Sequence, residues 1–215
     1  MTATQPQITP WSVPRIWEGE TCFILAGGPS LCGHLPLERF QRVITINTSW
    51  RLRPDGLHYF CDNAWWDRES TLLETVTGRN IGGMFWVKGG EPPTDPRVKW
   101  LPFSGQIGLE TNPSYLKHGS NSGYQCLNLA FHLGVKRIVL LGYDMRVQGD
   151  KTHWHQGHGH SPAYYDGILK NELLPLFQFI VEPLKQAGVE VINATPGSAL
   201  ECFPKRDLTD ILNEL

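Results

Sequence analysis

The segment TCFILAGGPS, residues 21–30, decides the fold that we expect for this chain. Its first part is a continuous apolar run, which is typical of a strand buried on both faces of a sheet. The run ends at Gly27-Gly28-Pro29-Ser30, where glycine lets the backbone approach a ligand and exposed N–H groups can bind an anion. We therefore predict a strand that leads into a nucleotide-binding loop. The loop lacks the lysine of a P-loop and the spacing of G-x-G-x-x-G, so a tight strand-to-helix turn explains it equally well.

Apolar runs alternate with amphipathic segments along the rest of the chain. We expect further strands at 43–47, 57–62, 83–88, 137–144 and 189–194, and helices at 35–40, 65–76, 121–135, 165–187 and 207–214. Continuous apolar runs separated by helices indicate a mainly parallel sheet with helices on both faces. The predicted fold class is therefore a Rossmann-like α/β fold.

Two polar stretches, 89–120 and 145–165, show no clear periodicity and are interpreted as long loops. Residues 1–20 contain three prolines and are expected to form an irregular arm. Residues 21–215 are expected to form a single nucleotide-binding domain, since 215 residues fall within the usual size of one domain.

The composition excludes several classes of protein. Hydrophobic residues make up 40% and charged residues 19%, which fits a globular chain rather than a disordered one. The net charge of −2 gives no overall field that attracts nucleic acid, although a local basic patch is compatible with it. Nucleic acid is therefore neither supported nor excluded as a partner.

Five scattered cysteines without a C-x-x-C pair argue against a disulfide framework or a cysteine zinc site. The N-terminal residues show no signal-peptide pattern, and no apolar run approaches the roughly 20 residues of a membrane helix. These features predict a soluble, cytoplasmic protein without a membrane span.

Polar residues follow most of the predicted strands. In parallel sheets ligands bind beyond the carboxyl ends of the strands, so these residues are candidates for one site. Side chains after the second and third strands would hydrogen-bond a base or ribose, or simply start loops; they are Asn47, Asp62 and Asn63. Asp144 and Arg146 follow the strongest strand, and the Arg146 guanidinium would neutralise a phosphate.

Ser122 and Gly123 open the predicted helix at 121–135. The positive end of a helix favours a phosphate or carboxylate, while simple capping by one of the neighbouring polar residues is the alternative.

The segment HWHQGHGH, residues 153–160, carries four histidines. Three interpretations stay open. The segment binds a metal through His153, His155 and His158, or one histidine acts as a general base, or the histidines are merely solvated in a polar loop.

The order of these motifs resembles the nucleotide-binding half of the bacterial lipooligosaccharide sialyltransferases. The resemblance rests on 23–31, Asn47, 59–63, 121–144, 159–161 and 193–198, and it spans about residues 21–204. The chain also resembles proteins encoded by bacteriophages and prophages, which are similar to the pterin pyrophosphokinase-like group. The resemblance implies a sialyltransferase-like fold and a location in the cytoplasm of a bacterial host.

The resemblance also implies roles for particular residues. Six of them match positions that hold a cytidine nucleotide: Gly28, Ser30, Asn47, Asn63, Ser122 and Gly123. His160 matches the histidine that deprotonates the acceptor hydroxyl. Those transferases need no metal and use tyrosine hydroxyls on the leaving phosphate, whereas this sequence has Arg146 at one such position.

The leading hypothesis is a glycosyltransferase that uses a nucleotide sugar, with His160 as base, Arg146 offsetting the leaving-group charge and no required cofactor. The alternative is a diphosphotransferase that uses ATP and Mg²⁺, with Asp62 and Asp144 as the metal ligands. A third hypothesis is a phage binding or assembly protein without catalysis. The acceptor stays unassigned, and a homo-oligomer is left open.

Overall fold

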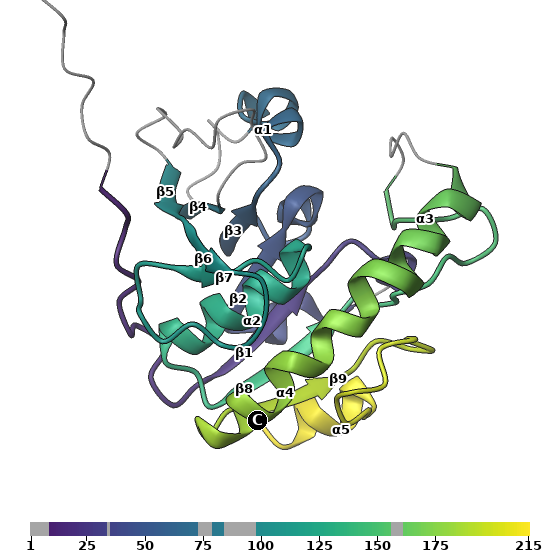
Figure 1. Cartoon of the computed structure of the whole chain (residues 1–215). Helices are drawn as coiled ribbons and strands as arrows, with labels where there is room; N and C mark the ends of the chain where they lie inside the picture. Colours follow the sequence, from purple (N-terminus) through teal and green to yellow (C-terminus); the bar gives the residue numbers. More distant parts are fainter. Residues whose placement is uncertain (1–8, 34, 73–78, 84–97, 156–160) are drawn as a thin grey trace, which may run out of the picture.

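A seven-stranded sheet forms the centre of the computed structural model, which describes residues 9–33, 35–72, 79–83, 98–155 and 161–215 (Figure 1). The strands run in the order β5-β4-β3-β2-β1-β8-β9, and every neighbouring pair is parallel. Their bounds are β1 (Thr21–Leu25), β2 (Arg42–Ile46), β3 (Leu57–Phe60), β4 (Arg79–Gly83), β5 (Val98–Leu101), β8 (Arg137–Leu141) and β9 (Glu190–Asn193). The predicted parallel α/β sheet is confirmed.

The first strand lies inside the sheet, between β2 and β8. Phe23 of β1 is level with Val43 of β2 and with Val139 of β8. After β1 the chain builds the sheet outward through β2 to β5, and then returns to place β8 and β9 on the other side. The strand order therefore reverses between β1 and β8, and such a switch point is where open α/β sheets bind ligands.

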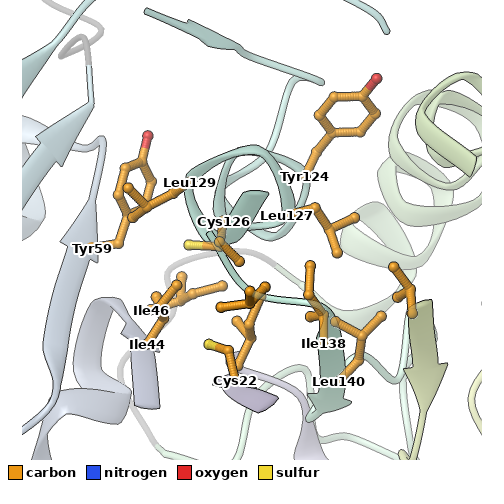
Figure 2. Packing of buried hydrophobic residues seen from close by; sticks show 14 of the residues in the cluster. Cys22, Ile44, Ile46, Tyr59, Tyr124, Cys126, Leu127, Leu129, Ile138 and Leu140 are labelled. Atoms are coloured by element: carbon orange, nitrogen blue, oxygen red, sulfur yellow. The ribbon is translucent and has the colours of Figure 1, made fainter. Parts of the chain in front are cut away.

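Helices cover one face of the sheet with α2 (Ser122–Leu133) and with a continuous helical rod. The rod consists of α3 (Pro162–Ile168), a π turn η5 (Leu169–Leu173), a 3₁₀ turn η6 (Leu174–Phe177) and α4 (Gln178–Gln186), and it runs diagonally across the sheet in Figure 1. Cys126 and Leu127 of α2 pack against strand residues such as Cys22 and Ile138 (Figure 2).

The opposite face carries shorter elements. Phe23 and Leu25 point to this side, and they pack with Phe40 and with Ile211 of α5 (Leu208–Asn213). Cys22 and Ile24, their neighbours along β1, belong to the α2 side. Because successive strand residues alternate between faces, an uninterrupted apolar strand requires a cover on both sides.

Some predicted bounds were wrong. The helix expected at 65–76 is α1 (Asn63–Glu69), and residues 73–78 lie outside the described residues. The strand expected at 83–88 begins earlier, as β4, and 84–88 also lie outside the description. The helix expected at 35–40 is a single 3₁₀ turn, η2 (Leu37–Arg39).

The stretch 89–120 was interpreted as a loop, but its described part holds strands. They are β5 at the sheet edge and a separate parallel pair, β6 (Phe103–Gly105) and β7 (Leu116–Lys117). Two- and three-residue strands are too short to show a period of two, so the sequence carried no signal for them.

The described part of the N-terminal arm, residues 9–20, is irregular as predicted but packed against the domain. Val13 and Trp17 are buried, and the Trp17 N–H donates to the Leu133 carbonyl at the end of α2. Across the described ranges, no helix combines the length and the apolar character needed to cross a membrane.

Candidate functional site

A cavity of about 150 Å³ opens at the switch point, where the ends of β1, β2 and β8 meet the start of α2. It is lined by residues 26–29, Ile46, Asn47, 121–123, 142–146, Thr152, His153, His155, Tyr165, Leu169 and Leu173. Typical small-molecule sites measure roughly 300–1,000 Å³, so a ligand as large as a nucleotide would extend beyond the rim. Most of the predicted site residues come together here.

The glycine loop is packed against the end of β8. The Gly28 N–H donates to the Gly142 carbonyl at 2.9 Å. A Cβ atom on Gly28 would overlap both the Asp144 carboxylate and that carbonyl. Gly28 has an ordinary extended backbone (φ −66°), so the glycine is needed because Asp144 fills the space of a side chain.

The Asp144 side chain holds the glycine loop in place through hydrogen bonds. Its buried carboxylate accepts hydrogen bonds from the Ser30 N–H (3.1 Å), the Ser30 hydroxyl (2.7 Å) and the Gln148 amide (2.6 Å). Burial raises the pKa of Asp144, while Ser30 and the nearby Arg146 act to lower it. Ser30 was predicted to hold a nucleotide. Its N–H and its hydroxyl both donate to Asp144 instead, and the residue is not part of the cavity lining. The pair braces the loop.

Asn47, the first residue of the 3₁₀ turn η3 (Asn47–Arg51), carries a buried polar atom without a partner. Its amide oxygen Oδ1 is buried and accepts no hydrogen bond from any described group. The residue is also in the left-handed region, with φ of 50°. An unsatisfied buried acceptor costs about 1–3 kcal/mol, and such costs concentrate where a ligand supplies the missing donor.

The first turn of α2 faces the same cavity. Asn121 is its N-cap, because the side chain accepts from the Tyr124 N–H at 2.8 Å, which confirms the predicted capping. The N–H groups of Ser122 and Gly123 lie in the first turn, where a helix offers no internal acceptor. A Cβ on Gly123 would lie 2.9 Å from the ring of Tyr143, so glycine lets the segment after β8 approach the helix. This end of α2 attracts anions.

Arg146 is the positive side chain of the cavity. Its side chain is exposed at the rim and lowers the pKa of Asp144 through its charge. A Cβ on Gly197 would lie 2.5 Å from a guanidinium nitrogen, and Gly197 has φ of 62°. The loop after β9 therefore leaves room for the guanidinium. The cavity unites an arginine with a helix N-terminus, two groups that bind phosphate.

Asp62 does not take part in the cavity. Its side chain accepts from the Ala64 and Trp65 N–H groups at 2.9 and 3.4 Å, and it is the N-cap of α1. Helix capping is an ordinary role of aspartate and accounts for its presence at this position. Asn63 is the first residue of α1, and its side chain lies outside the described residues.

The carboxylates proposed as Mg²⁺ ligands serve other roles. Asp144 accepts three hydrogen bonds inside the loop, and Asp62 caps a helix. Within the part of the chain that the structure describes, no three His, Cys, Asp or Glu side chains are grouped to hold a metal ion.

His153 and His155 form part of one wall of the cavity. The His153 ring pairs through Nδ1 with the Thr152 hydroxyl (3.1 Å) and through Nε2 with the Tyr165 hydroxyl (3.3 Å). Its centroid lies 5.5 Å from that of His155 and 5.1 Å from that of Tyr165. His158 and His160 lie outside the described residues, so the roles predicted for them stay predictions.

Trp154 attaches this wall to the glycine loop. Its N–H donates to the Gly27 carbonyl (3.0 Å), and its indole N–H donates to the Ser49 hydroxyl (2.9 Å). Ser49 in turn donates to the Ala26 carbonyl at the end of β1. Sequence reasoning missed Trp154, because tryptophan in a polar stretch carries no sign of its distant partners.

Sequence reasoning also missed Tyr165, Leu169 and Leu173, which reach the cavity from the helical rod. Burial raises the pKa of Tyr165 to about 12, so the phenol keeps its proton at neutral pH. The apolar spacing within 165–187 predicted the helix, but a spacing does not tell which helical residues line a site.

No family model, no curated protein and no solved structure matches this chain. The resemblance drawn from the order of the motifs therefore stays a prediction. The geometry of the cavity is what indicates a function.

Proposed function

We propose that this chain is a nucleotide-binding transferase that moves a glycosyl group from a nucleotide sugar to an acceptor. The observation that carries the proposal is the buried, unpartnered Oδ1 of Asn47 in a cavity that also holds two phosphate-binding groups. A ribose hydroxyl or a base amino group supplies the donor that Oδ1 lacks. A nucleotide carries such a donor and a phosphate in one molecule, so the arrangement favours a nucleotide.

The anion-binding groups suit the chemistry of group transfer. Negative charge grows on the phosphate when the bond between the sugar carbon and the phosphate oxygen breaks. The Arg146 guanidinium and the N–H groups of Ser122 and Gly123 surround the place where that charge would develop. Fixed donors of this kind stabilise the transition state more than the ground state. The general base, which removes the proton from the acceptor hydroxyl, is assigned to His160 on the resemblance alone.

Nucleotide binding is testable by thermal unfolding. A ligand that binds only the native state stabilises it by about 2.7 kcal/mol at a concentration of 100 Kd. We expect CMP, UMP, AMP or GMP to raise the melting temperature without added Mg²⁺. ATP binding that requires Mg²⁺ would instead favour the diphosphotransferase. If no nucleotide shifts the melting temperature, the nucleotide site does not exist and the binding or assembly protein becomes the better hypothesis.

Asn47→Gly tests the role of the unpartnered oxygen. Glycine accepts the positive φ and removes the amide, so the fold should be kept while nucleotide affinity falls about tenfold, the effect of one lost hydrogen bond. Ser120→Gly is the matched control, because Ser120 also has a positive φ (57°) and is not part of the cavity lining. Calorimetric titration of both variants with the best nucleotide measures the difference. Equal affinities in the two variants would contradict the role of Asn47.

A further inference from the structure

One wall of the cavity, which borders the glycine loop at Gly27, is made of rings and aliphatic side chains. Tyr165, Leu169 and Leu173 come from the helical rod, and His153 and His155 come from the segment that Trp154 fastens. The His153 ring neighbours the other two rings, with its centroid 5.5 Å from that of His155 and 5.1 Å from that of Tyr165. The cavity thus has a polar end that suits a phosphate and an end that suits an apolar, flat group.

The helical rod departs from α geometry where it borders the cavity. An α-helix turns by about 100° per residue, so residues four apart drift by about 40° and residues eight apart by about 80°. Tyr165, Leu169 and Leu173 are spaced in this way, yet all three line the cavity. The π turn Leu169–Leu173 has more residues per turn, which removes this drift. Single π turns inside α-helices occur frequently at functional sites.

We propose that this wall binds the base of the nucleotide, an inference that rests on the proposed function. A nucleobase has two apolar faces, and aromatic side chains bind such faces with little regard to which base is present. A transferred sugar carries hydroxyl groups on most of its carbons and needs donors and acceptors that Leu169 and Leu173 do not have. The expectation from the sequence was that residues after the second and third strands hydrogen-bond the base or ribose, and Asp62, which caps α1, does not meet it.

This placement orients the nucleotide within the cavity. The phosphate lies between Arg146 and the first turn of α2, and the base extends toward Leu173. The wall recognises a flat shape, so the four common nucleotides should differ in affinity less than each differs from a ligand without a base.

Two ligands that differ only by the base test the proposal. We expect wild-type protein to bind CMP at least about tenfold more tightly than ribose 5-phosphate. Leu173→Ala should weaken CMP about tenfold and change the affinity for ribose 5-phosphate less than about twofold. The control is Leu174→Ala, which removes the same atoms from the neighbouring, half-buried position outside the cavity and should leave both affinities unchanged. Leu173→Asn keeps the length and branching of the side chain and provides a second variant if the alanine variant does not fold.

The outcomes separate this inference from the proposed function. If Leu173→Ala weakens both ligands equally, or neither, the wall does not hold the base, although a nucleotide site remains. If Leu173→Ala keeps the CMP affinity of the wild type but hydrolyses a CMP-sugar more slowly, the transferred group lies at the wall and the inference is overturned. If wild-type protein binds neither CMP, UMP, AMP, GMP nor ribose 5-phosphate, the proposed function fails as well.

Discussion

At the scale of single residues, the buried carboxylate of Asp144 determines the shape of the glycine loop. It accepts three hydrogen bonds and occupies the volume that a side chain at position 28 would need. The sequence left two interpretations of the glycine loop, an approach to a ligand and a tight strand-to-helix turn. The structure shows that Gly28 makes room for an aspartate. The conformation of the loop is therefore explained by the hydrogen bonds between Ser30 and Asp144, without a ligand.

Gly28→Ala is expected to destabilise the protein by about 1–3 kcal/mol, because the added methyl group overlaps Asp144 and the Gly142 carbonyl. Gly33→Ala is the control, since no heavy atom lies within 4 Å of a Cβ at that exposed position. Its free energy of unfolding should stay within about 0.5 kcal/mol of the wild type. Urea unfolding measures both variants, and equal stabilities would contradict the packing argument.

At the scale of elements, α2 connects the core to the site. Its body is buried among strand side chains (Figure 2), while its first turn presents N–H groups to the cavity. Tyr59 of β3 donates to Gln125 at 2.9 Å, and the Cys61 thiol contacts the Ser122 hydroxyl at 3.4 Å. These contacts fix the position of the helix start relative to the strands.

Asn121→Ala removes the N-cap of α2 and should destabilise the protein by about 1 kcal/mol. It should also weaken nucleotide binding, because a frayed first turn no longer holds its N–H groups toward the phosphate. Asn121→Ser keeps a cap oxygen and should recover most of the stability. Urea unfolding and calorimetric titration check the two effects, and a fully stable alanine variant would contradict the capping role.

At the scale of the whole molecule, buried histidines tie stability to pH. Burial lowers the pKa of His58, whose ring contacts the Thr45 hydroxyl (2.7 Å) and the Pro54 carbonyl (3.0 Å). Burial likewise lowers the pKa of His132 on α2. In both cases the unfolded chain takes up the proton more readily than the folded protein.

Stability should therefore fall as the pH is lowered below the ordinary histidine pKa of about 6.5. Each buried histidine contributes a slope of at most about 1.4 kcal/mol per pH unit. We expect the free energy of unfolding to be lower at pH 5.5 than at pH 7.5, and the difference to be smaller in His58→Gln. Urea unfolding at the two pH values measures this, and an identical pH dependence in the variant would remove His58 as a cause.

The pattern of apolar residues along the chain was enough to predict the architecture on which the site is built. The apolar runs of β1, β2, β3, β8 and β9 are visible because strands buried on both faces leave long unbroken patterns. The positions after these strands then indicated part of the cavity lining, including Gly28, Asn47 and Arg146, because parallel strands end at the same edge.

Only the tertiary structure decided which polar residues face the cavity. Asp62 and Asn47 both follow strands, yet the first caps a helix and the second lines the cavity with an unpartnered oxygen. The wall formed by the histidine segment and the helical rod depends on the contact of Trp154 with Ser49, 105 residues away, and on a π turn. Local patterns record which residues are apolar but not which distant partners they contact, so this wall follows only from the packing of the folded chain.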